Sequence, residues 1–252
     1  MLDLMGGLDP DVAVGIAVTA AVAGLVRGFS GFGSAMIFVP VASALTSPHT
    51  AVVVIFVCDT LLTVPLVIAA VRTCVWREVI PLAAGALATV PLGIWLLVVV
   101  DPTLMRWIIS LLILTLVAVL ASGWRWRREP TRPTTVAVGG ASGLTGGMTG
   151  LAGPPVILFW MAGQDVPATV RANVITFLTL TGVFNCVGYI MSGLLTQDRV
   201  VSGLAIAPVY GLPLLLGVRL FRLATPGFFR ALAFGLCATA ALTSMPAFGG
   251  LG

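Results

Sequence analysis

The stretch that decides the fold is AGLVRGFSGFGSAMIFVP, residues 23–40, because it recurs in altered form as SGLTGGMTGLAGPPVILF, residues 142–159. Adding 119 to the residue numbers carries Gly24, Gly28 and Gly31 onto Gly143, Gly147 and Gly150. A shift of 124 later carries Gly93 onto Gly217. Such self-similarity predicts two copies of one structural unit. We take 1–123 as the first repeat, 124–135 as a linker and 136–252 as the second repeat.

The composition indicates a membrane protein. Of the 252 residues, 59% are hydrophobic and 9% are charged, against about 25% charged in soluble domains. Apolar runs long enough to cross a bilayer, about 20 residues each, lie at 50–71, 79–100, 103–123, 172–193, 200–221 and 228–246. We therefore expect an all-α, polytopic integral membrane protein.

Arginines give the orientation. All 13 basic residues are arginines, and they cluster in short loops, which is typical of topology signals and not of nucleic-acid binding. The densest cluster, WRWRREPTRP, begins at Trp124, so we place the loop 124–135 in the cytoplasm and both termini outside. Because each half contributes five segments, an odd number, the two copies are predicted to have opposite orientations in the membrane.

Each half begins with a pair of short apolar segments separated by glycines, 11–27 with 34–45 and 136–147 with 154–163. Twelve helical residues extend about 18 Å, little more than half the hydrocarbon thickness. Whether each pair crosses the membrane or is re-entrant is open. Corresponding pairs of short, Gly- or Pro-interrupted segments are the best sequence indication of a transporter's binding site.

These glycine breaks have the chemistry of an anion site. Helix N-termini carry unpaired N–H groups and a partial positive charge, and two of them would face each other near the bilayer midplane. The glycines would admit an anion to the backbone, hydroxyls would add donors, and Asn173 would complete the wall. The candidate substrate-binding residues are Arg27, Ser30, Gly31, Gly33, Ser34, Thr149, Gly150, Gly153 and Asn173. The alternative is that the glycines only allow close helix packing.

Two charged residues inside the apolar segments need an explanation. Arg27 aligns with Gly146, so it breaks the symmetry of the repeat. It would bind the anion at membrane depth or extend to the cytoplasmic surface. Asp59 lies in the third apolar run, where an acid needs a partner or a proton. It is the candidate for proton coupling, and structural pairing with Arg27 is the alternative.

The repeated motifs resemble the sulfite exporter TauE/SafE family. The resemblance covers nearly the whole chain, through GFSGFGSAMIFVP, its twin GGMTGLAGPPVILF and the Pro-x-Thr that starts each following run at Pro48 and Pro167. It implies a carrier in the bacterial inner membrane that moves sulfite, sulfonates or related organosulfur anions. The sequence departs from the family pattern in the residues after each motif, Gly33–Ala35 and Gly153–Pro155.

The sequence thus predicts a carrier for a small anion that works by alternating access between inverted repeats. The expected partners are the anion, the lipid bilayer and, in the proton-coupled version, protons; no cofactor or metal is expected, and oligomeric state is open. An anion channel would use the same breaks as a filter. An intramembrane enzyme or maturation factor is a further alternative. It lacks support, because the sequence shows no nucleophile, base and orienting residue at useful spacing.

Overall fold

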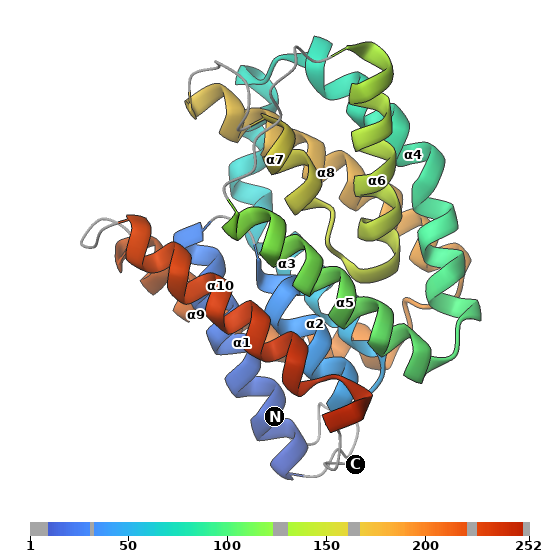
Figure 1. Ribbon diagram of the computed structural model, residues 1–252, viewed down its shortest axis with the longest axis vertical. Coiled ribbons are helices and arrows are strands. Elements are labelled where there is room, and N and C mark those ends of the chain that lie inside the picture. Colours follow the sequence, from blue (N-terminus) through green and yellow to red (C-terminus); the bar gives the residue numbers. More distant parts are fainter. Residues whose placement is uncertain (1–9, 31–32, 123–130, 161–166, 221–225, 249–252) are drawn as a thin grey trace. The chain divides into compact units, whose positions relative to one another are not determined.

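The computed structural model describes residues 10–30, 33–122, 131–160, 167–220 and 226–248 (Figure 1). Within these ranges the regular structure is helical and contains no strand. In chain order the elements are α1 (Pro10–Ser30), α2 (Ser34–Leu45), α3 (Pro48–Thr73), α4 (Trp76–Val99), α5 (Pro102–Ala121), α6 (Arg132–Thr149), α7 (Gly153–Trp160), α8 (Pro167–Met191), α9 (Gln197–Leu220), α10 (Pro226–Thr243) and the 3-10 turn η2 (Pro246–Phe248). The all-α class is confirmed.

Several of these helices begin at a proline, whose missing N–H costs nothing in a first turn. They are α1, α3, α5, α8 and α10. At α5 the side chain of Asp101 completes the cap, because its Oδ1 accepts from the backbone N–H of Thr103 at 2.8 Å and of Leu104 at 3.1 Å. The turns between predicted spans therefore fall where the sequence places them.

The helices have the length and apolarity of membrane spans. Five in the described part of the chain qualify individually (α1, α4, α5, α8 and α9), and α3 qualifies as a bent pair of segments, Pro48–Leu62 with Val67–Thr73. Large apolar side chains are exposed along them, including Val14, Leu92 and Leu212 at 61%, 49% and 70%. Such faces are suited to lipid, and the protein is a multi-pass membrane protein.

One expectation about length needs correction. The segment 11–27 was expected to be short, but α1 runs 21 residues to Ser30 and 19 of them form a candidate span. Likewise 136–147 extends to the 18 residues of α6. Gly28 and Gly147 lie inside these helices, and the backbones of neighbouring helices pack against them. The short helices of the two pairs are α2, with 12 residues, and α7, with 8.

The chain forms two compact units, each with helices from both predicted repeats. Unit 1 comprises 1–59, 100–122 and 194–252; in it α1 packs against α9 and α2, and α10 packs against α5 and α2. Unit 2 comprises 60–99 and 123–193; in it α4 packs against α6 and α8, and α7 packs against α6 and α8. Helix α3 contributes to unit 1 through Asp59 and to unit 2 from Thr60.

Glycines set the closest helix crossing in each unit. In unit 1 a Cβ on Gly28 would lie 3.0 Å from the Cα of Gly217, between α1 and α9. In unit 2 a Cβ on Gly147 would lie 3.3 Å from the Cα of Gly93, between α6 and α4. The two crossings use aligned positions of the repeats, and small residues at such positions let backbones approach. Packing is therefore one role of the repeated glycines.

Candidate functional site

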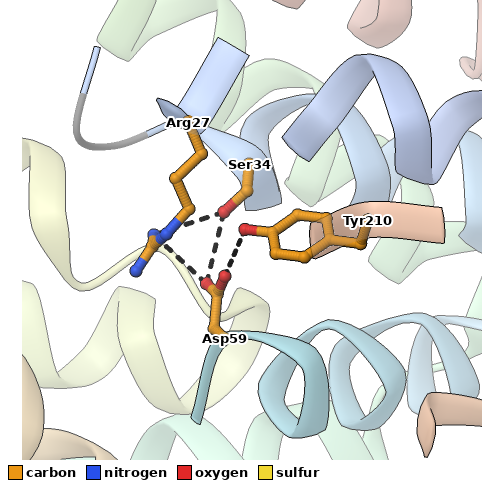
Figure 2. Close-up of polar contacts among 4 residues, drawn as sticks. All are labelled: Arg27, Ser34, Asp59 and Tyr210. Atoms are coloured by element: carbon orange, nitrogen blue, oxygen red, sulfur yellow. Dashed lines mark hydrogen bonds and ion pairs between the residues drawn. The ribbon is translucent and has the colours of Figure 1, made fainter. Parts of the chain in front are cut away.

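The first break in unit 1 carries a charged cluster at the start of α2. Arg27 from α1 places Nη1 3.2 Å from Asp59 Oδ2 on α3 and 3.3 Å from Ser34 Oγ, to which it donates. Ser34 Oγ in turn donates to Asp59 Oδ2 at 3.2 Å. Figure 2 shows the three side chains converging from three helices. Arginine and aspartate thus form an ion pair bridged by a hydroxyl.

Tyr210 from α9 completes this cluster. Its phenol donates a hydrogen bond to the other carboxylate oxygen, Asp59 Oδ1 (Figure 2). The Tyr210 side chain is fully buried. Asp59 therefore receives hydrogen bonds on both carboxylate oxygens. We call Arg27, Ser34, Asp59 and Tyr210 the charged cluster.

The charged cluster is accessible enough to exchange partners. Side-chain exposure is 19% for Arg27 and 25% for Asp59, whereas Ser34 is buried at 1%. The ion pair with Asp59 and the hydrogen bond to Ser34 both use Nη1 of the guanidinium. A guanidinium presents five donors in a planar fork and can bind an oxyanion bidentately. The ion pair is therefore neither sealed in the core nor freely exposed on the surface.

The backbone places Ser34 at the first position of α2. Gly33, the N-cap, has φ 94°, a left-handed conformation that glycine adopts without strain. Its carbonyl accepts from Met36 N–H at 3.1 Å. Glycine has no side chain, so the first turn of α2 receives no side-chain cap from Gly33. The helix start adds partial positive charge beside Arg27.

The second break in unit 2 is held by hydroxyl groups of α6. Gly150 is the C-cap, with φ 74°, and its N–H donates to Gly146 O at 2.9 Å. Thr145 Oγ1 donates to Leu151 O at 2.9 Å, and Ser142 Oγ donates to Ala152 O. Both carbonyls of the break are thus satisfied by side chains, as backbone in hydrocarbon requires.

The N-terminus of α7 offers few donors. It begins Gly153, Pro154, Pro155, and prolines have no N–H. Gly153 is buried, and Gly150 is exposed. Thr149 is fully buried, and its hydroxyl donates to Thr145 O at 2.7 Å. This break therefore presents backbone and committed hydroxyls, without a charged side chain among the residues described here.

Asn173 lies at the other end of α7. Its Oδ1 accepts from Val75 N–H at 2.7 Å, and its Nδ2 donates to Glu78 Oε2 at 2.9 Å. Trp160, the last residue of α7, donates to the same Glu78 oxygen at 3.1 Å. Seven residues separate Trp160 from Gly153, about 10 Å along a helix. Asn173 therefore ties α8 to the start of α4, away from the α7 N-terminus.

The predicted residues thus divide into separate groups. The structure brings Arg27, Ser34 and Asp59 together, beside Gly33, and the pairing of Arg27 with Asp59 that the sequence offered as an alternative is present. Thr149, Gly150 and Gly153 flank the second break. Gly31 lies outside the described residues, and Ser30 is described only as the end of α1.

Sequence analysis missed two parts of these sites. Tyr210 is one of only two tyrosines and lies in the middle of an apolar run, which is a signal for a buried hydroxyl with a partner. Ser142, at the first residue of the repeated motif, was not assigned a role. In the described part of the chain, no three His, Cys, Asp or Glu side chains are grouped as metal ligands.

Comparisons with known proteins address the family. The model of the family described as "Sulfite exporter TauE/SafE" matches residues 16–244. No curated protein and no solved structure matches the chain. The matched range contains both glycine breaks and all four members of the charged cluster.

Proposed function

The chain belongs to the sulfite exporter TauE/SafE family, and on that premise we propose that it carries sulfite or a related organosulfonate across the bacterial inner membrane. The family is one of membrane transporters of sulfur anions and not of enzymes. We place the loop 124–135 in the cytoplasm and both termini outside. The observation that carries the proposal further is the ion pair between Arg27 and Asp59.

Arg27 is the proposed anion ligand. A sulfite or sulfonate group presents oxygens that match the planar donor edge of a guanidinium, as a carboxylate does. Asp59 occupies that partner position in the structure, 3.2 Å from Nη1. The substrate therefore competes with the Asp59 carboxylate for Arg27, with Ser34 and the first N–H groups of α2 as additional donors.

This competition couples the anion to a proton. Arg27 and Asp59 together are neutral, so an added anion leaves one uncompensated negative charge. Two like charges 4 Å apart cost about 4 kcal/mol at an effective dielectric constant of 20. Protonation of Asp59 removes that cost and releases Arg27 to the substrate. We propose that anion and proton bind together, so that Asp59 is the coupling residue.

The second break contributes backbone to the proposed binding. We propose that Thr149, Gly150 and Gly153 border the path of the anion, and that transport alternates access between the inverted repeats. Support comes from the sequence repeat and from the aligned glycine crossings at Gly28 and Gly147. We leave Asn173 outside the binding set, because Val75 and Glu78 already occupy its side-chain groups.

The test is transport by the purified full-length chain in proteoliposomes. Sulfite, sulfoacetate, taurine, sulfate and thiosulfate are compared for saturable uptake and counterflow, with Arg27→Gln as the site variant. Arg219→Gln, an exposed arginine at the end of α9, is the matched control. Saturable uptake of a sulfur anion that depends on Arg27 and not on Arg219 supports the proposal; no uptake of any of the five refutes the substrate assignment, and unsaturable conductance would identify a channel.

A further inference from the structure

A small cavity lies in unit 1 between the same four helices that form the charged cluster. Its volume is about 20 Å³, room for one water molecule. Each helix lines it: α1 with Ile16, α2 with Phe38 and Ala42, α3 with Thr50, Ala51 and Val54, and α9 with Ser202 and Ile206; Thr46, which follows α2, also lines it. Arg27, Ser34, Asp59 and Tyr210 come from these four helices as well.

The cavity and the charged cluster lie along common helix faces. On α9, Tyr210, Ile206 and Ser202 follow at intervals of four, which places them on one face. On α2, Ser34, Phe38 and Ala42 do the same. Eight residues correspond to about 12 Å of helix. Phe38 and Ile206 line the cavity one turn from Ser34 and Tyr210, so the cavity extends from about one to about two helical turns from the charged cluster, toward the turn between α2 and α3.

Polar groups are concentrated at the outer end of the cavity. Thr46 Oγ1 donates to Ala42 O at 2.7 Å, and Ser202 Oγ donates to Asp198 O at 2.8 Å. Thr50 Oγ1 accepts from Ser47 Oγ at 3.0 Å. Hydroxyl oxygens have two acceptor lone pairs, so these three oxygens can accept hydrogen bonds from water. Two to four polar partners are what an internal water needs.

The inner end of the cavity is lined by buried apolar side chains. Phe38 and Ile206 are each 1% exposed and Val54 is 3% exposed. They lie between the hydroxyl groups and Asp59 in the helix sequence. A layer of apolar side chains that closes by excluding water is a known form of gate. A space for one water also excludes a sulfur oxyanion, so this region suits protons and not the substrate.

We propose that this cavity is the mouth of a water path that carries protons between bulk water and Asp59, separate from the route of the anion. Phe38, Ile206 and Val54 close the path in this conformation and admit water when they move apart. In the described part of the chain, the titratable side chains of Arg27 and Tyr210 contact Asp59, and neighbouring Cys58 donates to Gly203 O. The inference rests on the proposed proton coupling at Asp59.

The first experiment fills the cavity. Ala51→Val adds two methyl groups to its wall, and Ala20→Val, at a buried α1 residue that does not line it, is the matched control. Proteoliposomes with an internal pH indicator report proton movement driven by a sulfite gradient. We expect Ala51→Val to slow proton movement about tenfold, as narrowing of a hydrated path would, with sulfite binding unchanged and with Ala20→Val like the wild type.

The second experiment measures hydration directly and does not depend on tolerance of Ala51→Val. In full-length protein whose four cysteines are replaced, Ser202→Cys and Val54→Cys are tested with a membrane-impermeant, charged methanethiosulfonate applied from each side. Hydrated thiols react and dry ones are inert. We expect Ser202→Cys to react from one side, and Val54→Cys to react about tenfold faster when Phe38→Ala is added. Phe177→Ala, equally buried in unit 2, should have no such effect.

The outcomes separate the path from the coupling. If Asp59→Asn leaves sulfite-driven proton movement intact, the proposed coupling is wrong. The proposed water path, which rests on that coupling, is then refuted as well. If Asp59→Asn abolishes proton movement while Ala51→Val moves protons like the wild type, or while Ser202→Cys is unreactive in protein that transports, the coupling stands and the water path is refuted.

Discussion

The break between α1 and α2 carries charged side chains, whereas the break between α6 and α7 carries hydroxyls and prolines. In the first, Arg27 and Asp59 form an ion pair 3.2 Å long beside the start of α2. In the second, Ser142 and Thr145 satisfy carbonyls of the break. The two breaks come from one repeated motif. Features that both breaks share are therefore assigned to helix packing, and charged side chains found at one break are candidates for substrate binding.

None of the charged cluster is duplicated. The shift of 119 carries Arg27, Ser34 and Asp59 onto Gly146, Gly153 and Leu178, and the shift of 124 carries Ala86 onto Tyr210. At Gly146 a Cβ would lie 2.8 Å from the Cβ of Ala152, so that position has no room for an arginine. The duplicated glycines provide helix packing, and the charged side chains of the proposed anion site come from the first break.

The largest effect is expected from disrupting the close helix crossings at glycines, which both repeats share. Gly28→Leu and Gly147→Leu each force a side chain into a neighbouring backbone, and we expect each to cost about 3 kcal/mol or more, the upper end for overpacking. Gly182→Leu is the control, because no atom lies within 4 Å of a Cβ there. Thermal unfolding and monodispersity in detergent measure the effect. Equal stability of Gly28→Leu and Gly182→Leu would contradict the packing role.

The second-largest effect is expected from removing the arginine of the charged cluster at the first break. Arg27→Gln leaves Asp59 without its cation and the substrate without its ligand, and we expect the uptake of sulfite at low concentration to fall about 100-fold, or 2.7 kcal/mol. Arg219→Gln should stay within about twofold, as exposed charges contribute little. Uptake by Arg27→Gln at the level of Arg219→Gln would mean that the charged break is not the anion site.

Asp59→Asn sharpens the comparison by removing the carboxylate of the ion pair, so that Arg27 is left without its charged partner. Asparagine does not compete with the anion for Arg27, so we expect sulfite to bind about tenfold more tightly, as when a competing state is removed. Wild-type affinity should fall as pH rises, because ionised Asp59 competes; the variant should lose that dependence. Binding is measured by calorimetry over a pH series, with the protonation of sulfite itself subtracted. A variant with the wild-type pH dependence would contradict the coupling.

The smallest effect is expected at the hydroxyl-rich break. Ser142→Ala leaves the Ala152 carbonyl without its donor, which should cost about 1 kcal/mol in the free energy of unfolding. Sulfite affinity should remain within about twofold, since the role assigned to Ser142 is structural. Thr239→Val, an exposed residue whose hydroxyl bonds only its own helix, is the control. A loss of affinity without a loss of stability would place Ser142 in the binding site instead.

Most of the fold could be predicted from the sequence, because apolar runs and proline starts act locally. The boundaries of α2, Ser34–Leu45, match the expected segment, and the six long runs became α3, α4, α5, α8, α9 and α10. The ends of α1 and α6 could not be predicted, because glycine lowers helix propensity and the close backbone contacts at Gly28 and Gly147 are made by helices distant in the sequence. The division into repeats and their inverted orientation stay predictions.

The candidate site was only partly predictable, for a similar reason. Arg27 and Asp59 were evident because charges are rare inside apolar runs, and their pairing followed as one of two options. Tyr210 is 151 residues from Asp59 in the chain, so only the packing of α9 against α1 brings it to the carboxylate. Asn173 was assigned to the cavity wall from its helical spacing, which cannot reveal that Glu78 and Val75 occupy its side chain.

The central claim is that a bound anion takes Arg27 from Asp59 and that Asp59 then holds a proton. Infrared difference spectroscopy of the reconstituted protein on addition of sulfite tests this directly. The account predicts that the carbonyl band of a protonated carboxylic acid appears in the wild type, shifts in heavy water, and is absent from Asp59→Asn. Saturable sulfite binding to the wild type with no such band would contradict it.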